Sequence, residues 1–171
     1  RMCEQIDLSK KDITLIGVSM GGMISIEMAK QINVQQHIII ASIKTKHELS
    51  KRFRFLQQVP IYRLLSPRVF AYSYRFSKYF IRLFIHKKHF ILFDEMYQNC
   101  PPEFLKWGIE KIVHWQNEYI PPKLVHIHGT NDRTFPLANI RNALIVEKGT
   151  HFMNMDLPRT INYLIRKHIE N

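Results

Sequence analysis

The predicted fold depends most on one stretch of the sequence, Ile13-Thr-Leu-Ile-Gly-Val-Ser-Met-Gly-Gly-Met-Ile-Ser-Ile-Glu-Met-Ala-Lys30. It opens with the uncharged apolar run Ile13–Ile16, which has the composition of a buried β-strand. It then passes through Gly17-Val-Ser-Met-Gly21, which fits the pattern G-x-S-x-G. It leaves this turn as an apolar-faced helix, expected over Gly21–Ile32. A strand, a sharp turn with glycines and a helix are therefore predicted in direct succession.

The spacing of the glycines has a physical reason. A strand that reverses into a helix within one or two residues forces the central residue, Ser19, into strained backbone geometry. Side chains at the flanking positions are expected to collide, so glycine is expected at both Gly17 and Gly21. The turn then presents the Ser19 hydroxyl at a helix N-terminus, where the backbone amide of Met20 points toward any oxyanion that forms. This is the geometry of a nucleophilic serine, although the pentapeptide alone also fits a structural turn.

Length and composition indicate one folded domain. The 171 residues are 46% hydrophobic and 23% charged, which is typical of a folded chain and not of a disordered one. Apolar runs of the length that a transmembrane helix needs are absent from the sequence. Cys3 and Cys100 match no metal-binding or redox spacing, so we expect free thiols and a cytoplasmic location. Because the sequence starts at Arg1, we expect its native N-terminus to lie further upstream. Whether a signal peptide precedes it is left open.

The positive charge is concentrated in one segment. The chain carries a formal net charge of +11. Residues 44–89 hold twelve Lys or Arg residues and one acid, Glu48, so they account for the whole excess. Aromatic residues alternate with these bases, and a helix is expected over Glu103–Gln116, after the stop at Asn99–Pro102. The segment 44–118 is therefore predicted to be an inserted helical cap, strongly basic in 44–89.

The remaining residues, 1–43 and 119–171, are predicted to form an α/β core. Three further apolar runs have the composition of strands: His37–Ser42, Lys123–His128 and Asn142–Val146. Their continuous apolarity indicates a mainly parallel sheet covered by helices on both faces. A short helix is expected over Pro136–Ile140, and a terminal helix is expected to begin at Pro158.

Two polar residues follow predicted strands at positions suited to activate Ser19. A serine hydroxyl needs a base to become a nucleophile, and the base needs an acid that orients it. Asp132 comes just after the strand that ends near His128, and His151 comes just after the strand that ends at Val146. The carboxyl ends of parallel strands meet at one edge of a sheet, so the three residues are expected to lie together. Glu48, which follows the second strand, is a weaker alternative for the acid.

Together these motifs resemble those of the α/β-hydrolases. Gly17–Gly22 resembles the nucleophile elbow of that family, His128–Pro136 its acid loop, and Gly149–Phe152 its histidine loop. The resemblance covers nearly the whole chain, and the basic segment stands where the family has a variable cap. It implies an α/β-hydrolase fold, of which the chain holds the C-terminal portion, with Ser19 as nucleophile, His151 as base and Asp132 as acid.

The resemblance also implies what this chain does not contain. In the family, strands that precede the elbow carry a loop that supplies a second oxyanion donor, and no such segment precedes Ile13 here. The backbone amide of Met20 is therefore expected to be the one oxyanion donor within this chain. The edge of the elbow strand is expected to be bare, which favours pairing with another segment or chain.

The function that follows is hydrolysis by a serine nucleophile. The resemblance implies cleavage of carboxylic ester or thioester bonds through an acyl-enzyme intermediate, with no cofactor and no metal. The alternative is a truncated, non-catalytic α/β-hydrolase-like protein that is a binding module or an inactive fragment. A metal pair at His126 and His128, which share one face of a strand, is a weaker alternative because no third ligand is placed.

The cap has three interpretations. The first is a helical lid whose aromatic side chains face a small acyl substrate while its bases face water. The second is attraction of its bases to an anionic lipid surface or to an anionic acyl carrier such as a coenzyme A thioester. Nucleic acid is the least favoured partner, because the aromatics and bases form no recognised binding motif.

Overall fold

The structure is a computed structural model that describes residues 2–7, 9, 12–69, 72 and 87–170. The chain forms two compact units. Residues 1–49 and 116–171 make up the first, which we call the core unit, and residues 50–115 make up the second, which we call the helical unit. The division falls after residues 49 and 115, whereas the sequence placed the cap between residues 44 and 118.

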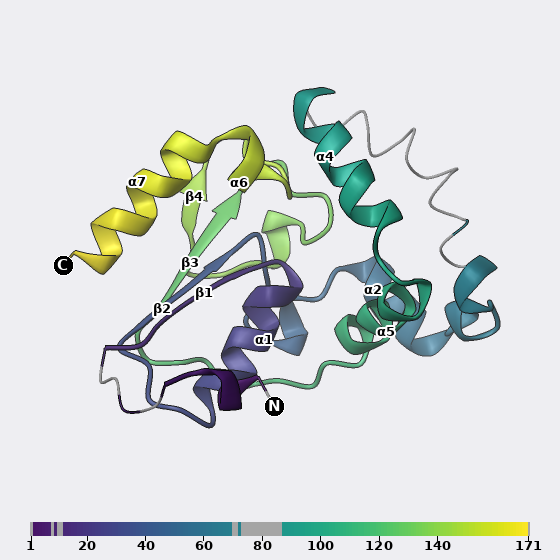
Figure 1. Cartoon of the computed structure of the whole chain (residues 1–171), viewed down its shortest axis with the longest axis horizontal. Helices are drawn as coiled ribbons and strands as arrows, with labels where there is room; N and C mark the ends of the chain where they lie inside the picture. The colour runs from purple at the N-terminus through teal and green to yellow at the C-terminus, as the bar shows by residue number, and fades with distance from the viewer. Residues whose placement is uncertain (1, 8, 10–11, 70–71, 73–86, 171) are drawn as a thin grey trace. The chain divides into compact units, whose positions relative to one another are not determined.

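The core unit is built on a parallel sheet, as predicted. The described residues contribute four strands to it: β1 (Thr14–Val18), β2 (Gln36–Ile40), β3 (Leu124–Gly129) and β4 (Leu144–Val146). They lie in the order β1-β2-β3-β4, and each neighbouring pair is parallel (Figure 1). Consequently all four strands end at one edge of the sheet, and the residues that follow them gather there.

Helices cover both faces of this sheet. Helix α1 (Met20–Ala29) joins β1 to β2 and packs on both. Helix α7 (Pro158–Ile169), preceded by the short α6 (Met153–Asp156), packs on the opposite face over β2 and β3 (Figure 1). Side chains alternate between faces along a strand, so Ile39 faces α1 while Ile38 and Ile40 face α7. This two-sided cover explains why β2 reads as a continuous apolar run.

The apolar centre of the core unit lies between the sheet and α7. Ile38 and Ile40 of β2, Ile127 of β3 and Ile161 of α7 are all buried in it. The predicted helix over residues 136–140 is a shorter 3-10 turn, Leu137–Asn139. Two further 3-10 turns, Cys3–Gln5 and Lys46–Glu48, lie in the same unit.

The helical unit contains the helices α2 (Lys51–Gln58), α4 (Lys87–Gln98) and α5 (Pro102–Val113), with a 3-10 turn at Ile61–Arg63. Helix α2 packs on α5, where the Gln57 side-chain amide donates to the Val113 carbonyl at 2.5 Å. The Tyr62 hydroxyl and a His114 ring nitrogen, 2.9 Å apart, add a second link. The exposed bases of this unit include Lys51, Arg52, Arg54, Arg63 and Arg68.

Three further predictions concern the basic segment, the two cysteines and membrane-spanning helices. Much of the predicted basic and aromatic segment, including residues 73–86, lies outside the described residues. Cys3 and Cys100 are free. In the part of the chain that the structure describes, no helix combines the length and apolarity needed to cross a membrane.

Candidate active site

Ser19 lies in the tight turn between β1 and α1 and has strained backbone geometry. Its φ of 53° and ψ of −123° are values that residues other than glycine rarely adopt. Its N–H donates to the carbonyl of Ile40 at 2.9 Å. Its own carbonyl accepts from the Gly22 N–H at 2.9 Å and from the Ser42 hydroxyl at 2.7 Å. The strain predicted from the sequence is present, and hydrogen bonds to the neighbouring strand and helix hold it in place.

The requirement for glycine in this turn differs from the expected one. A Cβ on Gly17 would overlap the backbone of Gly21, whose carbonyl carbon would lie 2.5 Å away. A Cβ on Gly21 would meet nothing within 4 Å, so the predicted collision at that position was wrong. The second excluded side chain is at Gly22, where a Cβ would lie 2.5 Å from the Ser42 hydroxyl oxygen. The close approach falls one residue later because α1 begins against the segment that follows β2.

The three residues predicted from their positions after strands lie in hydrogen-bond contact. His151 Nε2 lies 2.9 Å from Ser19 Oγ. His151 Nδ1 lies 2.9 Å from Asp132 Oδ2. Because the carboxylate accepts, Nδ1 carries the proton, and Nε2 is left to accept from the serine hydroxyl. The array joins residues far apart in the sequence and is the arrangement that a nucleophilic serine requires.

Asp132 is held by the backbone of its own loop. The residue is 4% exposed, and its Oδ1 accepts the N–H groups of Thr134 at 2.8 Å and Phe135 at 2.9 Å. With Oδ1 occupied by these two donors, Oδ2 is left to bond His151. The Phe135 ring then contacts the edge of the His151 ring, with centroids 5.6 Å apart. The same short loop therefore orients both Asp132 and His151.

The acid loop and the histidine loop are joined through their backbones. The Asn131 N–H donates to the Gly149 carbonyl at 2.8 Å, and the Thr130 N–H donates to the Val146 carbonyl at 3.1 Å. The two loops approach so closely that a Cβ on Gly129 would overlap the Gly149 carbonyl group, whose carbon would lie 2.5 Å away. Glycine is thus required where β3 ends, and the contact fixes the separation of Asp132 and His151.

Met20 is the first residue of α1. Its N–H therefore has no carbonyl four residues earlier within the helix to which it can donate. Met20 thus stands at the helix start where the sequence placed it, and its role as an oxyanion donor stays a prediction.

Glu48, the alternative acid, lies in a different set of contacts. Its carboxylate accepts from the Lys44 backbone N–H at 2.7 Å and pairs with the Lys44 ammonium at 2.9 Å. A weaker bond comes from the Arg141 N–H at 3.3 Å. His151 is bonded to Asp132 instead, so the geometry favours Asp132 over Glu48 as the acid.

Lys44 is buried, which corrects its assignment to a basic cap exposed to water. It is 6% exposed, belongs to the core unit and donates from Nζ to His126 Nδ1 at 2.9 Å. The sequence missed this because a lysine in a basic segment carries no local sign of a partner 82 residues away.

His126 and His128 share one face of β3, as predicted, and form a chain of hydrogen bonds. Lys44 can only donate, so His126 Nδ1 accepts and His126 Nε2 carries the proton. That proton points to His128 Nδ1, 3.2 Å away, and His128 Nε2 then donates to the Phe135 carbonyl at 2.8 Å. This series of hydrogen bonds ends at Phe135, whose N–H donates to Asp132. The two buried histidines therefore stabilise the acid loop.

Both of these histidines are neutral at pH 7. Burial, reinforced by the charge of Lys44, lowers the pKa of His126 to about 2. Burial also lowers the pKa of His128. In the described part of the chain, no group of three or more His, Cys, Asp or Glu side chains could hold a metal ion. The ring nitrogens of the pair are instead occupied by the hydrogen bonds described above.

The parallel sheet, its flanking helices and the order of its strands give the chain the α/β-hydrolase fold, which solved structures share. An α/β-hydrolase enzyme from a Medee basin deep-sea metagenome library is 11% identical, with a TM-score of 0.65 over 99% of this chain and 68% of that one. An esterase from Thermogutta terrifontis is 16% identical, with a TM-score of 0.64 and the same coverage.

A third similar structure is an esterase from Exiguobacterium antarcticum, which is 16% identical, with a TM-score of 0.63 over 99% of this chain and 70% of that one. The chain thus spans about two thirds of the length of these proteins. No protein-family profile matches the sequence, and no curated protein sequence matches it.

Proposed function

We propose that the chain provides the catalytic residues of a serine hydrolase that cleaves carboxylic ester or thioester bonds. The observation that carries the proposal is the unbroken array from Ser19 Oγ through the His151 ring to Asp132 Oδ2, with both contacts at 2.9 Å. The α/β-hydrolase fold and its similarity to known esterases support the same class of reaction.

The reaction would proceed through an acyl-enzyme. Ser19 Oγ attacks the acyl carbonyl carbon while His151 Nε2 takes the hydroxyl proton. The oxyanion that forms is stabilised by the Met20 N–H, and its collapse expels an alcohol or thiol that receives the proton from His151. A water molecule, deprotonated by His151, then attacks the acyl group and releases the carboxylic acid. Asp132 keeps the imidazole in the required tautomer and stabilises its protonated form.

The proposal is tested by labelling the chain with a fluorophosphonate probe, followed by mass spectrometry. Attack by Ser19 Oγ on phosphorus forms an O–P bond and releases fluoride, so a poised nucleophile carries one adduct. We expect a single adduct on Ser19 that is lost in both Ser19→Ala and His151→Ala. Circular dichroism shows whether each variant is folded. A folded wild-type chain without an adduct, or with one elsewhere, would contradict the proposal and favour a non-catalytic binding module.

The substrate class is a separate part of the proposal. We infer an apolar acyl or aryl group from the aromatic content of residues 44–118. Initial rates on p-nitrophenyl esters and the matching thioesters, from acetyl to decanoyl, test this inference. Rising kcat/KM with chain length supports it, and a strict preference for acetyl contradicts it.

The exposed bases of α2 support attraction of an anionic acyl carrier. Lys51 and Arg52 are exposed on α2, so their charges can attract the phosphates of a coenzyme A thioester. Reversing them to glutamate should lower kcat/KM for an acyl-coenzyme A but not for the uncharged p-nitrophenyl ester of the same acid. Equal effects on both substrates would contradict a role of charge.

A further inference from the structure

The peptide group between Ser19 and Met20 joins two atoms that matter to the serine site. Its N–H is that of Met20, the expected oxyanion donor, and its carbonyl oxygen is that of Ser19. Because a peptide group is planar and trans, the N–H and the C=O point in opposite directions. Whatever holds the Ser19 carbonyl therefore also sets the direction in which the Met20 N–H points.

Two donors hold this carbonyl. The Ser42 hydroxyl donates to it at 2.7 Å, and the Gly22 N–H donates to it at 2.9 Å. The Gly22 bond comes from the first turn of α1, whereas the Ser42 bond comes from the segment that follows β2. Ser42 is 0% exposed, so water does not compete for its bond.

The place of the Ser42 side chain is defined by close packing against α1. A Cβ on Gly22 would lie 2.5 Å from Ser42 Oγ and 2.7 Å from Ser42 Cβ. The helix can approach the segment after β2 only because residue 22 is a glycine. This close contact restricts the Ser42 side chain and keeps its hydroxyl beside the Ser19 carbonyl.

The residue before Ser42 has strained backbone geometry. Ala41 has a φ of 47°, in a region that residues other than glycine rarely adopt. It is 0% exposed, and its N–H donates to the Ile127 carbonyl at 3.0 Å. Such strain persists where the surrounding structure holds it, and it gathers at functional sites. At Ala41 the chain turns directly after β2, and this turn places Ser42 next to Ser19.

We propose that Ser42 is a positioning residue that orients and polarises the Met20 N–H toward the oxyanion. Its bond to the Ser19 carbonyl fixes the plane of the Ser19–Met20 peptide. Hydrogen bonds in a chain polarise one another, so a bond accepted by the carbonyl strengthens the N–H of the same peptide as a donor. Ser42 acts through Met20 and not on the substrate itself. The inference rests on the proposed hydrolase function, because it assigns a role in the transition state of that reaction.

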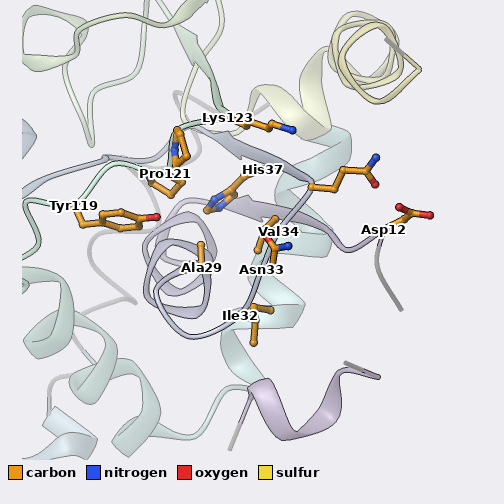
Figure 2. Close-up of a pocket in the computed structure, with 11 residues that line it drawn as sticks. Asp12, Ala29, Ile32, Asn33, Val34, His37, Tyr119, Pro121 and Lys123 are labelled. Atoms are coloured by element: carbon orange, nitrogen blue, oxygen red, sulfur yellow. The ribbon is translucent and has the colours of Figure 1, made fainter. Parts of the chain in front are cut away.

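Ser25 offers a matched control for Ser42. It is also a buried serine, and its hydroxyl donates to the Gly22 carbonyl at 2.8 Å, which belongs to a peptide further along α1. A second contact joins it to Nε2 of His37, 2.8 Å away, a residue that lines a cavity at the amino end of the sheet (Figure 2). Replacing Ser25 therefore removes the same kind of bond from the same helix and leaves the Ser19–Met20 peptide untouched.

The first test compares Ser42→Ala with Ser25→Ala in steady-state assays on a p-nitrophenyl ester. In Ser42→Ala, kcat should fall by about tenfold while KM stays within about twofold, since the lost interaction acts in the transition state. The fall stays below the roughly 10²–10³ that loss of an oxyanion donor costs, because the Gly22 N–H still holds the carbonyl. Ser25→Ala should lower the melting temperature but change kcat by less than about twofold.

A trifluoromethyl ketone tests the oxyanion itself. Ser19 Oγ adds to its carbonyl carbon, the hydroxyl proton passes to His151 Nε2, and no group leaves, so the oxyanion stays beside the Met20 N–H. Ser42→Ala should weaken inhibition by about tenfold, in step with kcat. Ser42→Cys, whose thiol is a weak donor, should lie between Ser42→Ala and the wild type and serves if Ser42→Ala does not fold. Equal losses in Ser42→Ala and Ser25→Ala, or a change in KM alone, would overturn the inference.

A third measurement needs no activity. The chain is labelled with ¹⁵N-methionine, and the Met20 amide is assigned by its loss in Met20→Leu. In Ser42→Ala the Met20 ¹⁵N resonance should move upfield, because the peptide is less polarised, and in Ser25→Ala it should stay in place. An unmoved resonance in Ser42→Ala would overturn the inference even in an active chain. If the resonance moves but the wild type takes no fluorophosphonate label, the proposed function fails while the orientation of Met20 by Ser42 stands.

Discussion

Histidines at the two ends of the parallel sheet differ in how completely their ring nitrogens are hydrogen-bonded. At the carboxyl end, His151 has a partner at each ring nitrogen, and so does His128. At the amino end, His37 is as deeply buried as His128 but is bonded through one nitrogen only. Full pairing fixes one tautomer and one ring orientation, which suits a group that must transfer a proton along a set path. At His37, Nδ1 is left buried without a hydrogen-bond partner.

The largest effect on kcat should come from replacing Ser19, at the carboxyl end of the sheet. Ser19→Ala removes the nucleophile, and we expect kcat for a p-nitrophenyl ester to fall by about 10⁶, as for other serine hydrolases. Steady-state assays with a stopped-time control for trace contaminants measure this fall. Ser9→Ala, at an exposed serine bonded to Asp7, is the matched control and should change the rate by less than about twofold. A rate retained in Ser19→Ala would assign hydrolysis to another group.

Asp132→Asn should have the next largest effect. The amide can present an N–H to His151 Nδ1 and so favour the wrong tautomer, which lowers kcat by about 10⁴ where a triad acid is replaced in this way. The control is Glu48→Gln at the alternative acid. It should lower the melting temperature by breaking the buried pair with Lys44, while kcat of the folded protein changes by less than about threefold. The reverse ranking of the two variants would make Glu48 the functional acid.

The burial of His37 predicts a pH dependence of stability. The pKa of His37 is about 4 in the folded chain because of burial, whereas an unfolded histidine titrates near pH 6.5. As the pH falls from 6.5 to 4, the unfolded chain gains a proton that the folded chain does not bind, so stability falls. The unfolding equilibrium constant should rise by about 100-fold from this residue.

Urea denaturation at half-unit pH steps measures that change. His37→Phe should show a shallower loss of stability between pH 6.5 and 4 than the wild type. The remaining slope belongs to other groups, including His126 and His128, whose pKa values are also lowered. Parallel pH curves for wild type and His37→Phe would show that His37 is not held neutral.

The smallest effect on kcat is expected at His128, which is bonded to the loop that holds Asp132. His128→Gln weakens the bond to the Phe135 carbonyl and loosens the loop that holds Asp132, so kcat should fall by about tenfold while KM changes less than twofold. Equal loss of kcat in His128→Asn and His128→Gln would be expected from loosening alone. A change in KM without a change in kcat would contradict a positioning role.

Much of the carboxyl end could be predicted from the sequence, because its residues stand at fixed places relative to apolar strands. Ser19, Asp132 and His151 each follow a strand, and parallel pairing brings such positions together whatever the detailed packing. The four strands and the terminal helix from Pro158 were predicted for the same reason, within a few residues of their observed bounds.

The contacts at the amino end of the sheet, and the buried contacts of Lys44, could not be predicted in this way. The His37–Ser25 pair depends on how α1 rotates against β2, which an apolar helix without a clear polar face does not reveal. The burial of Lys44 depends on a partner in β3, far along the chain. Gly22 rather than Gly21 is the constrained glycine because of the position of Ser42, which is a matter of local packing and not of spacing.

The backbone bonds between the acid loop and the histidine loop have a kinetic consequence. Thr130 and Asn131 are tied to Val146 and Gly149, and the Thr130 hydroxyl also accepts from the Lys148 N–H at 2.9 Å. A fluctuation that lifts one loop must therefore carry the other with it. Acid and base would leave the serine in a single event and return in a single event. Individual molecules would then alternate between fully competent and fully silent periods, instead of passing through a graded range of intermediate rates.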